Sequence, residues 1–369
     1  MKVHGILVAI FCVGGICGCK EKGPPVREAQ TTRQQQSFAA GLKPVKDPVS
    51  EKIYAFRLDV RQAYNNRRFD DLDRTAEELR TSKEVFGNGS WKIVQFYAAF
   101  ECRNSEPESM WQLHDQIHQA WIAAKPDSIT ARVAYADFLV SYAWRARGSG
   151  YADTVTPQGW NLFKSRIAAA HKVLDEARPL KDKDPCWWNV ALDIARSQGL
   201  ERTEYDALVA EAHAFEPRFW GYDVERAFSL LPRWYGKPGE WEAYAEQTAA
   251  RPDGLGVELY ARIVIFLKSY HDNILQESKA SWPKTLEGLA RMRSAYPESL
   301  TILHDTAHLA SLAGDWKLAK DTFDQIGDRY VDECWSSADE FVRLRAIATE
   351  NTRRMEPPAV EQAPPAGKR

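Results

Sequence analysis

The sequence predicts an all-α protein, because apolar residues recur at helical spacing through nearly all of residues 51–350. Two such stripes are Ala131, Tyr135, Phe138 and Tyr142, and then Trp160, Phe163, Ile167, Ala170 and Leu174. The alternation of apolar and polar residues with hairpin dipeptides, which is typical of paired strands, is almost absent. We therefore expect a core of packed helices with no sheet.

Prolines separate these helices at intervals that suggest a repeat. The prolines that end one helix or open the next are Pro126, Pro185, Pro217 and Pro297. The clearest helical hairpin spans residues 301–326 and turns at Leu312-Ala313-Gly314-Asp315. It resembles a degenerate tetratricopeptide unit, whose repeat is about 34 residues long. Because the other intervals are irregular, we expect an irregular tetratricopeptide-like array of helical hairpins, similar to a solenoid.

Composition excludes several classes of protein. The 49 Lys and Arg residues nearly balance the 51 Asp and Glu residues, and the formal net charge is -2. A general nucleic-acid binder needs a surplus of positive charge, so we expect no nucleic-acid partner. The sequence contains no P-loop, no dinucleotide-binding glycine motif and no G-x-S-x-G element, and we expect no cofactor.

The first residues carry an export signal. A short positive start is followed by the apolar stretch Gly5–Ile16, which is too short to span a bilayer. It ends in Ile16-Cys17-Gly18-Cys19, which resembles a bacterial lipobox, so we expect cleavage after residue 18 and lipidation of Cys19. The residue after the lipidated cysteine is Lys20 rather than Asp, which in a diderm host favours the periplasmic side of the outer membrane. The alternative is an ordinary secretory signal.

The remaining chain divides into three parts. Residues 19–50 are polar and lack apolar periodicity, so we expect a disordered tether after the lipidated cysteine. Residues 51–350 form the helical repeat-like domain, and residues 351–369 form a Pro-rich tail that we expect to be disordered. Three cysteines fall within the domain, and their apolar neighbours favour buried, unreactive thiols; they are Cys102, Cys186 and Cys334.

Four segments resemble an uncharacterised bacterial family that is known only as a domain of unknown function (number 4034). They are Phe69-Asp70-Asp71-Leu72-Asp73 with Glu77-Glu78-Leu79-Arg80; Trp91-Lys92 with Phe96-Tyr97; Tyr142 to Thr156 with Trp160 and Phe163; and Leu231 to Trp241. The resemblance extends over roughly residues 51–330. It implies a helical repeat-like fold and carries over no activity.

The end of one predicted helix offers a candidate binding segment. Its residues are Trp144, Arg145, Arg147, Gly148, Gly150, Tyr151 and Asp153. Two glycines free the backbone there, while two guanidiniums beside aromatic rings can receive a carboxylate, a sugar or a peptide backbone. The alternative, which we favour, is a structural loop in which arginines donate to backbone carbonyls. Both interpretations stay open at this point.

Two histidine pairs echo the H-E-x-x-H zinc motif. His114 and His118, and His304 and His308, each lie four residues apart on one helical face. In both pairs Asp replaces the Glu that acts as general base, and no third ligand follows at the expected spacing. We therefore predict no metal site at either pair.

Two functions from different classes compete. The first is a non-catalytic scaffold in the cell envelope that binds a protein or peptide on a concave helical surface. One specialised form of it is an immunity lipoprotein that neutralises a toxin from a neighbouring cell. The second is an envelope hydrolase with a site near Arg147–Tyr151 or at one of the histidine pairs. The residues favour the scaffold and identify no catalytic group.

Overall fold

The computed structural model describes residues 42–148, 150 and 152–355. Several predicted features lie outside the described residues: the signal peptide, the lipidation site Cys19, the candidate Tyr151 and residues 356–369 of the tail. Within them, no helix is both long enough and apolar enough to cross a membrane.

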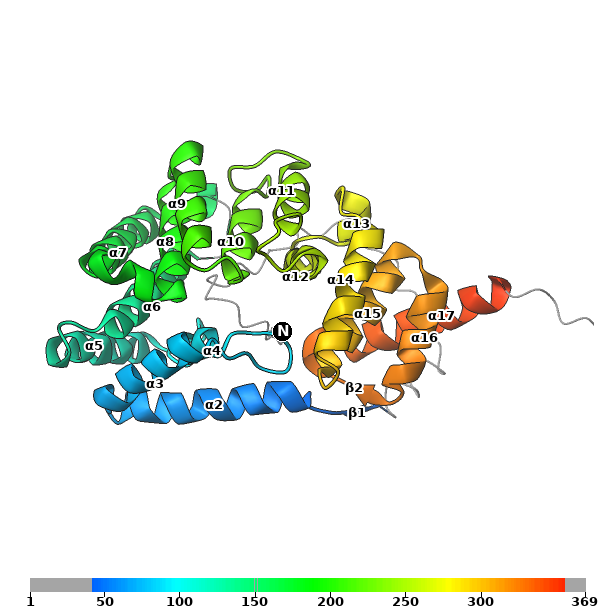
Figure 1. Ribbon diagram of the computed structural model, residues 1–369, viewed down its shortest axis with the longest axis horizontal. Coiled ribbons are helices and arrows are strands. Elements are labelled where there is room, and N and C mark those ends of the chain that lie inside the picture. The colour runs from blue at the N-terminus through cyan, green and yellow to red at the C-terminus, as the bar shows by residue number, and fades with distance from the viewer. Residues whose placement is uncertain (1–41, 149, 151, 356–369) are drawn as a thin grey trace, which may run out of the picture.

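The prediction of an all-α helical array is confirmed (Figure 1). The α-helices are α2 (Pro48–Asn65), α3 (Phe69–Ser82), α4 (Lys92–Ala98), α5 (Glu108–Ala124), α6 (Ile129–Arg147), α7 (Pro157–Glu176), α8 (Pro185–Gln198), α9 (Arg202–Phe215), α10 (Gly221–Ser229), α11 (Glu240–Ala249), α12 (Val257–Leu267), α13 (Ile274–Glu277), α14 (Trp282–Ala295), α15 (Leu300–Ala313), α16 (Trp316–Ile326) and α17 (Ala338–Met355). Short 3₁₀ turns are η1 (Ala152–Thr154), η2 (Arg178–Lys183), η3 (Lys268–Tyr270) and η4 (Asp332–Cys334). Among the described residues, strand pairing is limited to β1 (Lys43–Pro44) with β2 (Arg329–Tyr330) and one bridge between Val85 and Trp91.

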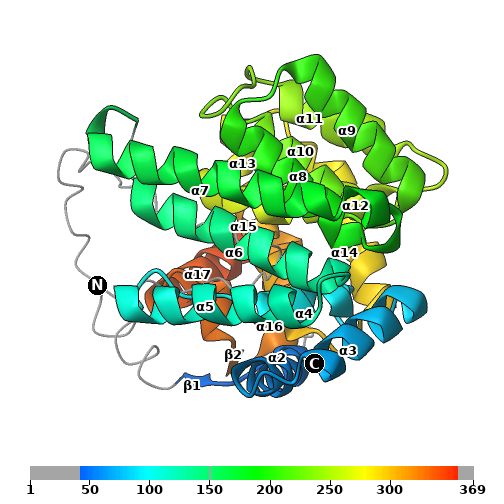
Figure 2. The same ribbon diagram turned by 90° about the vertical axis from the view of Figure 1, so that its left-hand side faces the viewer.

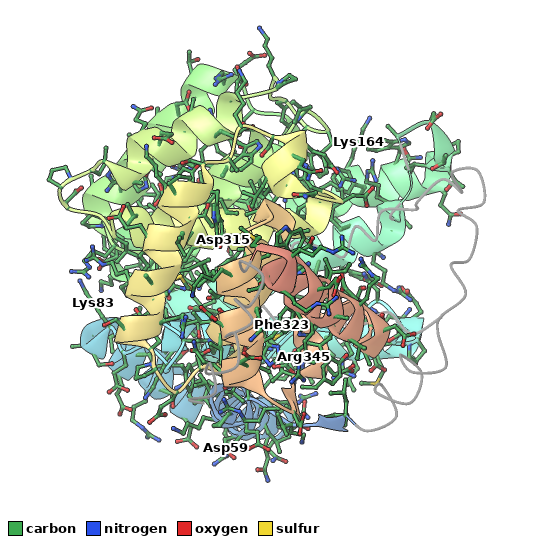
Figure 3. The ribbon with its side chains drawn as sticks, turned by 90° about the vertical axis from the view of Figure 1, so that its right-hand side faces the viewer. Asp59, Lys83, Lys164, Asp315, Phe323 and Arg345 are labelled. Atoms are coloured by element: carbon green, nitrogen blue, oxygen red, sulfur yellow. The ribbon has the colours of Figure 1, made fainter. Side chains whose placement is uncertain are left out.

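Most helices that follow one another in the chain pack side by side, as helical hairpins do, and α12 packs on α14 across the short α13. In Figure 1, helices α4, α6, α8, α10 and α12 lie toward the middle of the molecule, whereas α5, α7, α9 and α11 lie at its periphery. The inner helices are buried on nearly all sides, and every residue of α10 is buried. The predicted hairpin of residues 301–326 is the pair α15 and α16, and its core residue Phe323 is fully buried beneath α17 (Figure 3).

The two ends of the array meet. Strand β1 pairs in parallel with β2, and α2 lies along the same edge of the molecule (Figure 1). Asp47 is 1% exposed and caps α2 by accepting from Val49 N at 3.0 Å. Its second oxygen accepts from Thr301 Oγ1 at 2.6 Å, at the start of α15. Helix α2 thus begins within the segment expected as a tether, and α17 continues to Met355, beyond the expected boundary at residue 350.

The loop between α3 and α4 fills the middle of the array. Trp220 Nε1 donates to Gly89 O at 3.1 Å, and Arg262 Nη2 donates to Asn88 O at 3.2 Å. Gly89 has φ +77°, and a Cβ there would collide with Arg262 and Tyr296. A glycine is therefore required where this loop meets α12.

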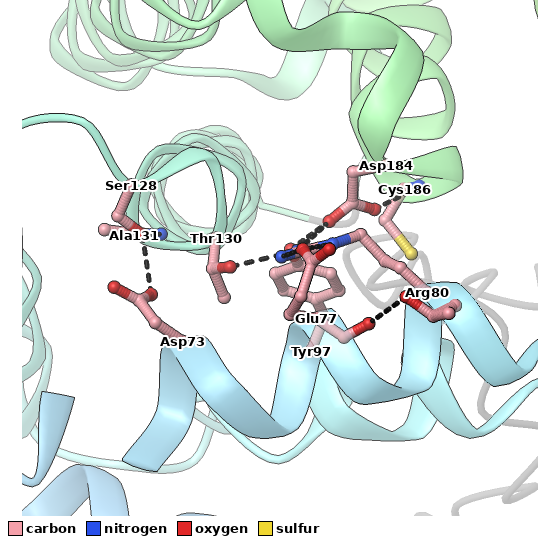
Figure 4. A network of polar contacts seen from close by, with 10 residues as sticks. Asp73, Glu77, Arg80, Tyr97, Ser128, Thr130, Ala131, Asp184 and Cys186 are labelled. Atoms are coloured by element: carbon pink, nitrogen blue, oxygen red, sulfur yellow. Dashed lines mark hydrogen bonds and ion pairs between the residues drawn. The ribbon is translucent and has the colours of Figure 1, made fainter. Parts of the chain in front are cut away.

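A buried polar network joins four helices near this loop (Figure 4). Arg80 of α3 donates to Asp184 Oδ2 at 2.9 Å and to Thr130 Oγ1 of α6 at 3.0 Å. Tyr97 of α4 donates to the same carboxylate oxygen at 2.6 Å. The other oxygen, Asp184 Oδ1, caps α8 by accepting from Cys186 N at 2.8 Å. The side chains of Arg80 and Asp184 are 7% and 0% exposed, so the pair is shielded from water.

The three cysteines of the domain are free thiols. Burial is the main cause that raises the pKa of each thiol, and it raises the pKa of Cys102 to about 11. All three thiols therefore stay protonated at neutral pH, which makes them weak nucleophiles.

We expect Arg80→Ala to destabilise the protein by about 3–5 kcal/mol, because it leaves the Asp184 carboxylate buried without its cation. Urea unfolding followed by circular dichroism measures this loss. The matched control is Arg74→Ala on the same helix, whose side chain is 65% exposed and whose removal should change stability by less than about 0.5 kcal/mol. Equal effects of the two substitutions would contradict the structural role given to Arg80.

Candidate functional site

The predicted binding segment begins where α6 ends. Gly148 has φ +77° and ψ 178°, a conformation that is essentially restricted to glycine. Gly150 also needs to be small, because a Cβ there would collide with Thr154 Oγ1. Thr156 caps the N-terminus of the next helix, α7, because its Oγ1 accepts from Gly159 N at 3.0 Å. The two glycines thus shape a tight connection between α6 and α7.

The indole of Trp144 points into the core rather than toward solvent. It is 6% exposed, and its ring lies 4.8 Å from that of Phe163 and 5.6 Å from that of Trp234. Trp234 belongs to the segment Leu231 to Trp241. This segment and the segment Tyr142 to Thr156 both resemble the same family. The structure therefore brings two segments together that are far apart in the sequence.

Arg147 holds the loop that follows it. Its Nη1 donates to Gly148 O at 3.2 Å and to Gly150 O at 2.9 Å. The guanidinium also lies 5.3 Å from the ring centres of Trp144 and Trp160. Burial, and then the charge of Arg233, lowers the pKa of Arg147. These contacts favour the structural interpretation of this arginine.

The other predicted residues do not converge with Arg147. Arg145 turns toward α5, where it pairs with Glu108 and lies 5.2 Å from the ring centre of Trp111. Asp153 is exposed in η1. The two guanidiniums therefore do not form one anion site, although Trp144, Arg147, Gly148 and Gly150 do lie together.

His114 and His118 are buried in α5 among aromatic rings. Both pack against Tyr64 and Phe138, with ring centres 5.1–6.1 Å apart. Arg61 Nη1 donates to His114 Nε2 at 3.1 Å. Burial and then the charge of Arg61 lower the pKa of His114 to about 4, and burial lowers that of His118 well below its ordinary value. Both rings are neutral at pH 7, and a guanidinium already occupies the lone pair of His114 Nε2.

His304 and His308 lie in α15 and pack against Trp335. Trp335 Nε1 donates to His304 Nδ1 at 2.8 Å, and His304 Nε2 donates to Arg329 O at 2.9 Å. Since both ring nitrogens are engaged, His304 has no lone pair left for a metal ion. Across the described part of the chain, no three His, Cys, Asp or Glu side chains are grouped to hold a metal.

An open groove lies between α2 and the segment that joins α4 to α5. Its volume is about 440 Å³, and Figure 2 shows α5 above α2 on this side of the molecule. The apolar lining residues include Tyr54, Leu58 and Met110, and the charged ones are Arg57, Arg61, Arg103, Glu101 and Glu106. The size is that of a ligand site, which usually has 300–1,000 Å³.

This groove was not predicted from the sequence. One usable signal was present, because Tyr54 and Leu58 lie one turn apart on a helix whose buried stripe is carried by other residues, among them Ile53 and Val60. Both side chains are largely exposed, at 62% and 54%. The opposing wall begins at Ala98, about 40 positions later in the chain, and no local pattern predicts that approach.

Residues 56–178 match the family model described as a domain of unknown function (DUF4034). The match confirms the resemblance over these residues, which contain the first three of the four similar segments. The fourth segment, Leu231 to Trp241, lies beyond the matched range, although Trp234 contacts Trp144 within it. No curated protein and no solved structure matches the chain.

We expect Arg147→Ala to lower stability by about 1–2 kcal/mol, because two carbonyls lose their donor and two indoles lose their cation. Thermal and urea unfolding measure the change. Arg147→Lys keeps the charge but loses the planar fork, so it should recover only part of the loss. Unchanged stability in Arg147→Ala would contradict a structural role and would favour the interpretation that Arg147 contacts a ligand.

Proposed function

We propose that the protein is a lipid-anchored, non-catalytic scaffold of the cell envelope that binds a protein or peptide. The observation that carries this proposal is the groove between α2 and the α4–α5 connection, because it leaves Tyr54 and Leu58 exposed beside three arginines. Tyrosine and arginine are enriched among the residues that dominate binding energy at protein interfaces.

The groove suits an extended segment that carries both apolar and polar groups. Tyr54 and Leu58 supply apolar contact area. Arg57 and Arg61 of the same helix line the groove and already donate across it, Arg57 to Gln95 and Arg61 to Ala99 O. Two of the groove's titratable lining groups are uncharged at neutral pH, since His114 is neutral and the Cys102 thiol is protonated. This combination supports recognition of a polypeptide and supplies no activated nucleophile.

The lipid anchor is the second part of the proposal, and it rests on Ile16-Cys17-Gly18-Cys19. Lipidation of Cys19 with two or more acyl chains would hold the helical array at a membrane surface, because multiple chains anchor stably where one is marginal. In a diderm host, Lys20 favours the outer membrane, with the array in the periplasm.

We expect a photo-crosslinking residue, p-benzoylphenylalanine, at position 58 to capture a discrete partner in cells. The adduct should appear on a denaturing gel and be identified by mass spectrometry. The matched control carries the same residue in place of Leu162, an exposed leucine of α7 outside the groove, and should give no such adduct.

The same experiment tests specificity with Tyr54→Ala. This exposed substitution should change stability by less than about 0.5 kcal/mol, yet it should reduce the adduct severalfold. Equal adducts from positions 58 and 162, or an adduct that ignores Tyr54→Ala, would rule out the groove as the binding surface.

We also expect the wild-type protein to fractionate with membranes and to label with a radioactive fatty acid. Cys19→Ala should abolish the label and prevent anchoring, because the thiol is the acylated group. Cys12→Ala, within the predicted signal peptide, is the control and should retain both properties. Unchanged labelling and fractionation of Cys19→Ala would exclude the lipid anchor.

A further inference from the structure

A second, smaller cavity lies between α6 and the chain that follows α4. It is lined by Phe100, Glu101, Cys102, Ala134, Asp137, Phe138 and Ser141, and the α6 residues share one helical face. Its volume is about 10 Å³, which is room for a single group the size of a water molecule. It shares Glu101 and Cys102 with the groove but faces α6 instead of α2.

Two polar side chains in this cavity lack partners. Ser141 is 7% exposed, and its hydroxyl oxygen has no hydrogen-bond partner. Asp137 makes no hydrogen bond or ion pair with any residue in the described part of the chain, although part of its surface remains open to the cavity. Buried polar groups are nearly always paired, so the unpaired Ser141 hydroxyl beside the half-buried Asp137 indicates an occupant that brings its own donors.

The charges around Asp137 select the sign of that occupant. Burial is the main cause that raises the pKa of Asp137, to about 8, and the carboxylates of Asp193 and then Glu101 add to the effect. Two thiols are also close, Cys102 in the cavity wall and Cys186 on α8, and burial is the main cause that raises the pKa of each. The residues that line the cavity include the two carboxyl groups of Asp137 and Glu101 and no Lys, Arg or His, so the cavity favours a cation over an anion.

We propose that this cavity binds the ammonium head of a primary alkylamine. An ammonium group has three N–H donors, and the cavity offers acceptors on Asp137, Ser141 and Glu101. The rings of Phe100 and Phe138 add faces that attract a cation. A hard metal ion fits less well, because calcium takes six to eight oxygen ligands and the walls are partly aromatic. This proposal does not depend on the peptide groove.

Binding is coupled to a proton. At pH 7 the Asp137 carboxyl is mostly protonated; when R–NH₃⁺ enters, the carboxyl O–H bond breaks, the carboxylate pairs with the ammonium and the proton passes to the buffer. Close to one proton should be released per ammonium bound at pH 7, and almost none at pH 9.5, where the carboxylate is already ionised.

The experiment is isothermal titration of the purified full-length protein with two probes, n-butylammonium chloride and Nα-acetyl-lysine methylamide. At pH 7 the heat should depend on the ionisation enthalpy of the buffer, and this dependence should vanish at pH 9.5. Binding of butylammonium alone indicates a free amine as the natural ligand, whereas binding of the lysine amide indicates a lysine side chain. Tetramethylammonium, which has no N–H donor, and sodium chloride should not bind.

Two variants separate binding from folding. Asp137→Asn keeps the shape but removes the charge, and it should weaken butylammonium binding by at least about tenfold and end the proton release. Ser141→Ala removes one acceptor and should weaken binding by about two- to tenfold. The matched control is Asp127→Asn, an exposed aspartate just before α6, which should bind as the wild type does. Circular dichroism confirms that each variant is folded.

Absence of saturable binding of both probes to the folded wild type overturns the proposal and leaves a single water as the occupant. Binding that is equal in Asp137→Asn, or matched by tetramethylammonium, overturns it as well. Neither result bears on the groove, because the crosslink at position 58 reports on a different surface.

Discussion

The buried ion pair between Arg80 and Asp184 joins residues that are 104 positions apart and fixes how the inner helices meet. Tyr97 of α4 donates to the Asp184 carboxylate, and Thr130 of α6 accepts from the Arg80 guanidinium. A single carboxylate and a single guanidinium therefore set the spacing of α3, α4, α6 and α8 (Figure 4). A hydrophobic core alone tolerates small shifts between helices, whereas a buried charge pair does not, because each displaced partner loses its compensation. The groove and the small cavity both border helices that this network positions.

Similar pairs continue around the inside of the array. Arg196 of α8 donates to Glu225 of α10 at 2.6 Å, and Arg262 of α12 donates to Glu258 at 2.8 Å. Arg262 also reaches the α3–α4 loop, so the interior is filled by side chains and backbone from both halves of the chain. An extended concave surface, as in an open solenoid, therefore does not describe this array well. Its ends are joined through Asp47, and binding surfaces have to be sought where side chains remain exposed, as they do at Tyr54 and Leu58.

The helices and the α15–α16 hairpin were predictable from the sequence, because helical periodicity and prolines at helix starts are local signals. Arg147 was predicted as either a loop-holding or a ligand-binding residue, and its bonds to Gly148 and Gly150 favour the first. Closure of the array was not predictable, since Asp47 and Thr301 are 254 residues apart and nothing local marks them as partners. The groove and the Asp137 cavity were missed for the same reason. Asp137 lies within an apolar stretch of α6. The helical periodicity there marks Phe138 as a core residue and gives no signal for Asp137 beside it.

Most buried carboxylates in the described part of the chain have a cationic or hydrogen-bonding partner, which the half-buried Asp137 lacks. Asp184 is paired with Arg80, Asp193 and Glu225 with Arg196, Glu258 with Arg262, and Asp305 with Lys268. Asp223 has no arginine, yet it accepts from Tyr244 at 2.8 Å and from Thr248 at 2.5 Å. Most of these buried carboxylates are thus compensated, although Glu242 Oε2 is buried without a hydrogen-bond partner, and an uncompensated carboxylate is destabilising to keep charged. Asp137 departs from this pattern at a position that opens onto a cavity and faces the unpartnered hydroxyl of Ser141 along the same helical face. An apolar side chain would fill this position without that cost, and the proposed ammonium ligand gives the carboxyl group here a physical role.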